Sequence, residues 1–166
     1  MGCEDSRQGH SHVHKGEGVR GNGIYSSNGT SNLNGNEVYN INYTGYNNKG
    51  GYNKAAMGIC LLGSGNKDVQ YNKVYKINNY NTAQLQLEVA GIYISGGTNL
   101  LNANFVNSLT FAGTPNWGAK IIGIQLGEGT YTLTNNVVSL SNDLDIETYA
   151  IYDANTQTTN LYYISI

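Results

Sequence analysis

The stretch Gly91-Ile92-Tyr93-Ile94-Ser95-Gly96-Gly97, followed by Asn104-Phe105-Val106-Asn107-Ser108-Leu109, decides the fold. Each half is a short apolar or β-branched run bounded by Gly, Asn or Ser, which is typical of a β-strand that ends in a turn. The Gly-Ile opening of the first half and the Asn-x-Val-x-x-Leu motif of the second both return elsewhere in the chain. The chain is therefore built from repeated units.

The repeat has a nearly constant period. Successive openings are 35, 33 and 32 residues apart, and the Asn-x-Val motif follows each opening after 12 to 14 residues. A period of this length indicates a solenoid, a propeller or another repeat array. The openings lie at Gly23, Gly58, Gly91 and Gly123, with a near match at Ala150, and the motif begins at Asn36, Asn72, Asn104 and Asn135.

The strand content of one unit selects among these architectures. No window has a sustained apolar period of 3.6 residues, which argues against a helical solenoid. Each unit supports two or three strands, too few for a propeller blade. The sequence therefore predicts an all-β protein, a right-handed parallel β-helix of about five coils with long loops at one corner. We expect residues 1–20 to form a disordered polar leader and residues 21–166 to form the solenoid, as a fragment of a longer one.

Stacking of the coils predicts ladders of equivalent residues about 4.8 Å apart. The isoleucine that follows each opening is expected to point inward, as is the valine of each motif. The motif's asparagines are expected to line one tight corner, where Asn tolerates left-handed backbone and its amide can bond to adjacent coils. The predicted inward ladders are Ile24, Ile59, Ile92, Ile124 and Ile151, and Val38, Val74, Val106 and Val137.

On these residues the chain resembles the right-handed parallel β-helix repeat proteins of the pectate-lyase-like superfamily. The resemblance rests on the Gly-Ile-Tyr openings at 23–25 and 91–93, the Asn-x-Val corners and the closing Asn160-Leu161-Tyr162-Tyr163. It is closest to the non-catalytic repeats, rich in Asn, Gly and Tyr, of large secreted bacterial surface proteins. The resemblance implies the fold more specifically than a function, because such coils serve both enzymes and adhesins.

Composition narrows the class of partner. Charged residues make up 12% of the chain, the net charge is −2, and there are 22 Gly and 14 Tyr. A nearly neutral surface rich in Asn, Tyr and Thr suits the extracellular space and offers no basic patch for nucleic acid. No apolar run approaches the roughly 18 residues of a membrane span, and no signal peptide is visible in this chain.

Aromatic side chains are the candidates for binding polysaccharide. The long segments between coils all leave the rung at one corner, and insertions on one side of a solenoid often form its binding side. A second row of tyrosines, Tyr25, Tyr93 and Tyr152, follows three of the inward isoleucines by one place and is expected to face outward. The alternative is that these rings only pack against the coils. The predicted glycan-binding residues are Tyr43, Tyr46, Tyr52, Tyr80, Trp117 and Tyr93.

Catalytic and metal-binding signals are weak. The only arginines lie in the leader, and the sequence has no paired carboxylates in the pattern of a lyase or glycoside hydrolase of this fold. We expect no catalytic residues and no cofactor, although Ca²⁺ is an option for the acidic loop. The alternating histidines of the leader could bind a transition metal. The metal candidates are His10, His12 and His14 in the leader, and Asp143 and Asp145 in the loop.

The sequence therefore favours a non-catalytic structural or adhesive segment of an extracellular or cell-surface protein, with weak glycan binding. The alternative is a polysaccharide lyase or glycoside hydrolase without a recognisable catalytic set in this segment. Expected partners are a polysaccharide or another surface protein. We also expect self-association through the C-terminal coil, since the apolar ladders of a terminal unit need a cover.

Overall fold

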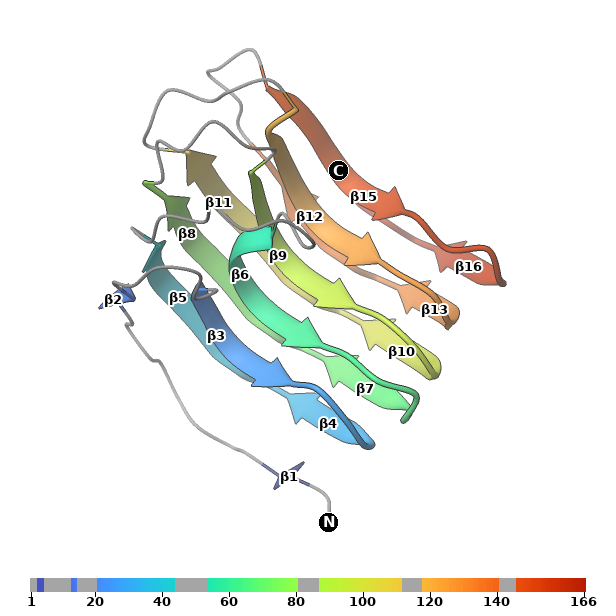
Figure 1. Ribbon diagram of the computed structural model, residues 1–166. Helices are drawn as coiled ribbons and strands as arrows, with labels where there is room; N and C mark the ends of the chain where they lie inside the picture. Colours follow the sequence, from blue (N-terminus) through green and yellow to red (C-terminus); the bar gives the residue numbers. More distant parts are fainter. Residues whose placement is uncertain are drawn as a thin grey trace.

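The computed structural model describes residues 3–4, 13–14, 21–43, 54–80, 87–111, 118–140 and 146–166. Within these ranges every regular element is a β-strand, and every strand pairing is parallel. Figure 1 shows the strands stacked coil upon coil into a solenoid of about four turns, which matches the right-handed parallel β-helix in fold. The predicted fold class is confirmed.

Three parallel sheets form the walls of the solenoid. Sheet A contains β4 (Ser31–Asn34), β7 (Lys67–Gln70), β10 (Thr98–Asn102), β13 (Thr130–Thr134) and β16 (Thr159–Tyr162). Sheet B contains β5 (Glu37–Tyr43), β8 (Lys73–Asn79), β11 (Phe105–Phe111) and β14 (Val137–Ser139). Sheet C contains β3 (Gly21–Ser26), β6 (Lys54–Leu61), β9 (Glu88–Ile94), β12 (Lys120–Leu126) and β15 (Glu147–Asp153).

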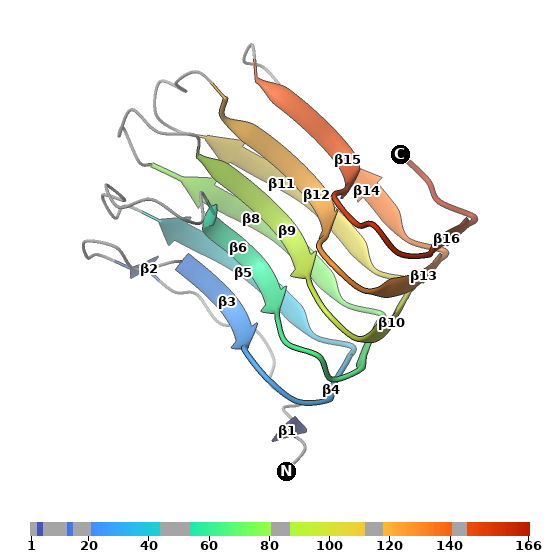
Figure 2. The same ribbon diagram turned by 45° about the vertical axis from the view of Figure 1, so that its right-hand side comes forward.

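Each coil runs through sheet C, then sheet A, then sheet B, so the described strands form four three-stranded coils and the start of a fifth with β15 and β16. Two short strands of the leader pair with coil one: β1 (Cys3–Glu4) lies beside β4, and β2 (Val13–His14) lies beside β5. Of the segments that join sheet B to sheet C, residues 44–53, 81–86, 112–117 and 141–145 lie outside the described residues. Figure 2 shows the same stack from a second side.

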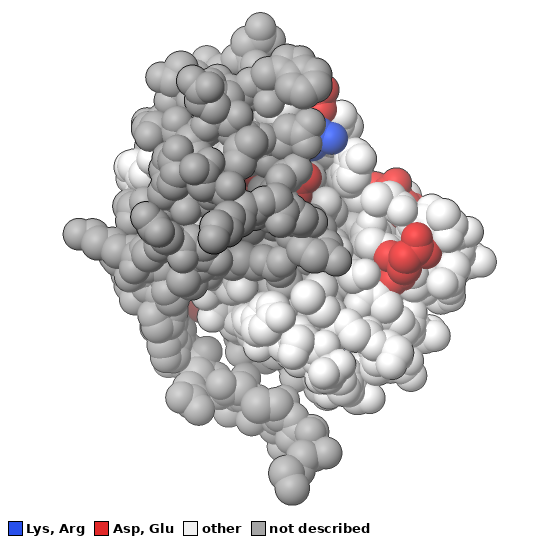
Figure 3. Space-filling view, in the orientation of Figure 1, with Lys and Arg blue, Asp and Glu red and all other residues white. Residues whose placement is uncertain are grey.

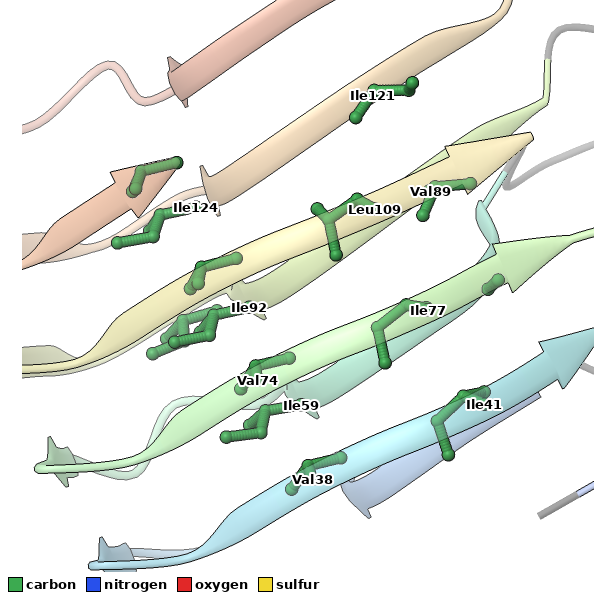
Figure 4. Close-up of a cluster of buried hydrophobic side chains, with 14 of the residues drawn as sticks. Val38, Ile41, Ile59, Val74, Ile77, Val89, Ile92, Leu109, Ile121 and Ile124 are labelled. Carbon is green, nitrogen blue, oxygen red and sulfur yellow. The ribbon is translucent and has the colours of Figure 1, made fainter. Parts of the chain in front are cut away.

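The isoleucine ladder is confirmed in every coil. The registers pair Ile24 with Ile59, Ile59 with Ile92, Ile92 with Ile124, and Ile124 with Ile151. The three inner members are fully buried, and the two outer ones pack against the same core. Figure 4 shows the side chains of the inner members Ile59, Ile92 and Ile124 between the sheets, together with those of Val38 and Val74. Burial of each inner isoleucine contributes roughly 1.5–3 kcal/mol.

The glycine of each opening is required by the valine ladder. A Cβ atom on Gly91 would lie 2.3 Å from Cγ1 of Val106 and 2.7 Å from the carbonyl oxygen of Gly123. Real Cβ atoms do not approach backbone this closely, so only glycine fits. Gly58 and Gly123 are crowded in the same way by the valines of their own coils. The repeated Gly-Ile opening therefore reflects packing of sheet C against sheet B.

The predicted register of coil four is wrong by one residue. Val106 pairs with Val138, which is buried, and Val137 is 36% exposed. A slip of one residue exchanges the two faces of a strand. The sequence is ambiguous here because Asn and Val are both doubled at 135–138. Val137 lies three residues before Leu140, as Val106 lies three before Leu109, and this spacing favoured Val137 as the inward valine. In the structure β14 ends at Ser139, and Leu140 packs against the core from outside that strand.

Candidate functional site

The asparagine ladder lies at the corner between sheets A and B, which we name the Asn corner (residues 35–36, 71–72, 103–104 and 135–136). Oδ1 of Asn104 accepts hydrogen bonds from the backbone N–H and from Nδ2 of Asn72, at 3.1 and 2.9 Å. Nδ2 of Asn104 donates to the carbonyl oxygen of Val69 at 2.8 Å and to Oδ1 of Asn136 at 2.9 Å. Each amide therefore links its own coil to both neighbours.

The fourth member of this ladder is Asn136, and the prediction of Asn135 is corrected. Asn136 is fully buried, and its Nδ2 donates to the carbonyl oxygen of Leu101 at 2.9 Å. Asn135 precedes it with φ of 54° and is exposed, and its Nδ2 donates to Oδ1 of Asn102 at 3.2 Å. Asn36, Asn72 and Asn104 occupy the ladder as predicted.

The corner between sheets C and A is built differently. We name it the carbonyl corner (residues 62–66, 95–97 and 127–129), because its turns direct backbone carbonyl groups toward the interior. Lys67 is 1% exposed, and its ammonium donates to the carbonyl oxygens of Gly63, of Ser95 at 3.1 Å and of Gly96 at 2.7 Å. Burial lowers the pKa of the Lys67 ammonium below its usual value.

The next two coils use other donors at the same inward position, since Lys67 aligns with Asn99 and Asn99 with Tyr131. Nδ2 of Asn99 donates to the carbonyl oxygens of Gly96 at 3.1 Å and Gly97 at 3.2 Å. The Tyr131 hydroxyl donates to the carbonyl oxygen of Ile94 at 2.9 Å, and burial raises its pKa. These three side chains satisfy turn carbonyls and are not available to a ligand.

The outer face of sheet A carries a shallow groove that runs along the solenoid axis across four coils, which we name the sheet A groove. Its two walls are rows of outward side chains in register. One row is Thr30, Asn66 and Thr98, and the other is Asn32, Asp68, Leu100 and Thr132. Most of these residues are Thr or Asn, so the groove offers hydroxyl and amide groups beside a lining that is mostly apolar, and Asp68 is the one outward charged group of these rows.

Hydrogen bonds between side chains hold the edge of this groove in place. Thr134 Oγ1 donates to Asn102 Oδ1 at 2.8 Å, and Asn102 Nδ2 donates to Gln70 Oε1 at 3.1 Å. Gln70 Nε2 donates in turn to Asp68 Oδ1 at 2.7 Å. On the other row, Asn66 Oδ1 accepts the backbone N–H of Thr98 at 3.1 Å. Asp68 is therefore oriented by Gln70 of its own strand, which neighbouring coils hold in turn, and Asn66 is oriented by the next coil.

The outer face of sheet B carries an aromatic pair. The rings of Tyr39 and Tyr75 stack with centroids 5.2 Å apart and planes inclined by 5°. The Tyr75 hydroxyl donates to the Glu37 carboxylate at 2.8 Å, and that bond raises the pKa of Tyr75. Because the two rings cover each other's faces, this pair stabilises adjacent coils.

The outer face of sheet C is largely apolar. The predicted outward row aligns as expected, Tyr25 with Cys60, Cys60 with Tyr93, and Tyr93 with Gln125. Only Tyr25 is well exposed, at 51%, whereas Tyr93 is 9% exposed. A second hydrophobic cluster accounts for this burial: it contains Met57, Cys60, Ala90, Tyr93 and Ile122.

An ion pair lies at one end of sheet C. Lys120 Nζ lies 3.7 Å from a carboxylate oxygen of Glu147, and it also lies 4.9 Å from the centroid of the Tyr152 ring. The Tyr149 hydroxyl donates to Glu147, and that bond raises the pKa of Tyr149. Glu147 is 57% exposed, so the pair contributes little stability.

The predicted glycan-binding residues are not brought together in the described part of the chain. Tyr43 is 1% exposed and belongs to the main core, and Tyr93 belongs to the second cluster. Tyr80 is 46% exposed at the end of sheet B. Tyr46, Tyr52 and Trp117 lie outside the described residues.

The predicted metal sites receive no structural description. His10, His12, Asp143 and Asp145 lie outside the described residues, and His14 is described only as part of β2. Among the residues that the structure describes, no group of three or more His, Cys, Asp or Glu side chains could hold a metal ion.

The sheet A groove and the donors of the carbonyl corner were missed by sequence reasoning. The groove left a signal in the sequence, because polar residues recur at alternate positions along the sheet A strands, as expected for an outward face. These residues lie at 30, 32, 66, 68, 98, 130 and 132. The inward position of Lys67 left none, since Lys is rarely buried and its alignment with Asn99 and Tyr131 depends on the register.

Comparison of this chain with protein-family models, with curated proteins and with solved structures gave no match. Within the described ranges, no helix has the length and apolar character needed to cross a membrane.

Proposed function

We propose that the chain is a non-catalytic structural and adhesive segment of an extracellular or cell-surface protein that binds polysaccharide weakly. One observation carries this proposal: the residues that repeat from coil to coil lie inside the solenoid, where they join one coil to the next or pack two sheets of one coil together. The asparagine ladder, the isoleucine ladder and the glycine–valine contacts are internal. The outward residues vary between coils, so the repeated feature of this chain is its scaffold.

The character of the surface supports an adhesive role. Figure 3 shows that charged side chains are sparse on the described part of one face. The outward rows of sheet A consist mainly of Asn and Thr, which exchange hydrogen bonds with sugar hydroxyl groups. A kinship with the non-catalytic repeats of secreted bacterial surface proteins, within the pectate-lyase-like superfamily, is part of this proposal and is supported by the Asn-x-Val corners.

A sedimentation assay with insoluble polysaccharides tests the proposal. The protein is incubated with cellulose, mannan, xylan and calcium pectate, with and without added Ca²⁺, and the pellet and supernatant are analysed separately. We expect protein in at least one pellet and no release of reducing or unsaturated ends. Reproducible product release would favour the lyase or hydrolase alternative. Failure to sediment with any of the four polymers, in a well-folded sample, would contradict the adhesive role.

We also propose that this 166-residue chain self-associates through coil five. Leu161 is 51% exposed, whereas Leu133, its partner in the adjacent strand, is fully buried. Ile166 is 88% exposed. A second copy is the proposed cover for these apolar groups. Sedimentation velocity should show dimers or larger species as concentration rises, and a double substitution Leu161→Lys with Ile166→Lys, at the two exposed positions, should reduce them. A monomer at all concentrations would contradict this proposal.

A further inference from the structure

The sheet A groove has the geometry of a site for an extended chain. Its two rows follow the stacking direction, so equivalent side chains recur about every 4.8 Å along it. That spacing is close to the advance of one sugar residue in an extended β-linked glycan. Successive coils, from Asn32 to Thr132, therefore present one polar group, or the apolar group of Leu100, to each successive residue of such a chain.

The charges of the groove disfavour anionic polymers. Asp68 is half-buried and faces outward, and Lys67, the one cation among the described residues that line the groove, directs its ammonium away from it to three backbone carbonyl oxygens. A uronate, a sulfated sugar or a nucleic-acid phosphate would thus meet one carboxylate and no accessible ammonium. Neutral hydroxyl groups carry no such penalty and can donate to Asp68.

The backbone of sheet A disfavours a peptide as the occupant. Peptides add to sheets through an unpaired strand edge. The strands beneath the groove, β4, β7, β10 and β13, are each paired on both sides, β4 with β1 and β7. Only side chains are left to recognise a ligand. Asn66 Oδ1 is occupied by the Thr98 N–H, so the amide offers its NH₂ group as a donor.

We propose that the sheet A groove binds a neutral, extended polysaccharide, with the Asn, Thr and Asp68 side chains bonding to hydroxyl groups and Leu100 packing against the apolar face of one sugar ring. This inference rests on the proposed function, and names the site and the ligand class that the adhesive role would use. It places the glycan on sheet A and not at the corner between sheets B and C, where Tyr80 lies.

Isothermal titration calorimetry of the full chain tests the inference, with cellohexaose and mannohexaose as neutral probes and hexagalacturonate as the anionic probe. We expect saturable binding of at least one neutral hexasaccharide and none of hexagalacturonate. Leu100→Arg should weaken binding at least tenfold, since the guanidinium would fill the groove. Asn107→Arg is the matched control: it adds the same group to the outer face of sheet B, and its affinity should stay within twofold of wild type.

Three outcomes would overturn the inference: no neutral probe binds the wild-type chain, hexagalacturonate binds as well as the neutral probes, or Leu100→Arg binds like Asn107→Arg. Circular dichroism of each variant establishes that the β-fold is retained, and Thr98→Arg provides a second groove variant if Leu100→Arg does not fold. A loss of glycan affinity in Tyr80→Ala alone would instead place glycan binding at the corner between sheets B and C. That result would refute the groove and leave the adhesive function standing.

Discussion

The Asn corner and the carbonyl corner meet the same demand in opposite ways. At both corners, polar backbone groups are buried between stacked coils and need hydrogen-bond partners. The Asn corner satisfies them with asparagine in each of four coils, whereas the carbonyl corner uses Lys67, Asn99 and Tyr131 in succession. One corner is built from a repeated residue and the other from individual ones.

The length of the connection accounts for part of the difference. At the Asn corner two residues separate the strands in every coil, as between β7 and β8 or between β10 and β11. At the carbonyl corner five residues separate β6 from β7, whereas three separate β9 from β10 and β12 from β13. A constant turn places its polar atoms identically in each coil, so one side chain suits all. The longer turn before β7 moves its carbonyl groups, and the long side chain of Lys67 reaches them; Asn99 and Tyr131 follow turns of equal length, so length does not account for the difference between those two.

Removal of one asparagine from the Asn corner should have the largest effect on the free energy of unfolding. Asn104→Ala leaves the backbone N–H and Nδ2 of Asn72 and the carbonyl of Val69 without the partner they have now. Because these groups are buried, we expect a loss of about 3 kcal/mol in the free energy of unfolding. Asn135→Gly, at an exposed neighbouring position whose φ of 54° glycine adopts freely, should change it by less than about 0.5 kcal/mol. Urea denaturation measures both, and equal losses would refute the register of coil four.

Substitution at Lys67 tests the carbonyl corner, where each coil uses a different donor. Lys67→Met fills a similar volume but removes the donor to three carbonyl oxygens, and we expect a loss of about 2 kcal/mol at pH 7. The expected loss is smaller than at Asn104, because removing the ammonium also removes the cost of burying a charge. An unchanged denaturation midpoint at pH 7 would show that those carbonyls do not depend on Lys67.

The lowered pKa of Lys67 also predicts that the stability of the folded chain depends on pH. Its folded pKa is lowered, so between that pKa and the ordinary value of 10.5 the unfolded chain holds a proton that the folded chain has released. The stability of the wild type should therefore rise with pH across this window. Denaturant titrations from pH 7 to pH 10 should show a steeper rise for the wild type than for Lys67→Met, and parallel curves would contradict the prediction.

Tyr131→Phe should cost about 1 kcal/mol, because the hydroxyl donates to a buried carbonyl. Its pKa is raised in the folded chain, whereas a tyrosine in the unfolded chain ionises near 10.0. Above pH 10 the unfolded state is therefore favoured, and the wild type loses stability as the pH rises. The loss should be less steep for Tyr131→Phe in thermal melts between pH 9 and pH 11. Identical slopes would argue that Tyr131 ionises in the folded state as well.

The smallest effect is expected at Tyr43, a buried tyrosine that serves neither corner. Its hydroxyl is buried and has no hydrogen-bond partner within the described structure. Tyr43→Phe should leave the free energy of unfolding within about 0.5 kcal/mol of wild type, or raise it slightly, because an unsatisfied polar group is removed. A loss as large as that of Tyr131→Phe would indicate a partner for this hydroxyl and would weaken the contrast between the two tyrosines.

The sequence by itself determined the architecture, because features with constant spacing leave a period in the chain. The parallel β-helix, the isoleucine ladder and the asparagines of coils one to three were all predictable, since each is held by the same residue one coil above or below. The requirement for glycine beside valine is part of the same period. These are local consequences of stacking identical rungs.

Only the tertiary structure decided what varies between coils. The doubled Asn and Val at 135–138 fit two registers, and burial of Val138 selects one. The inward position of Lys67 depends on the length of its turn, and the burial of Tyr43 and Tyr93 on what packs around them. The sheet A groove arises where four coils place different polar residues side by side. Such features depend on neighbours about 32 residues away, and no single motif encodes them.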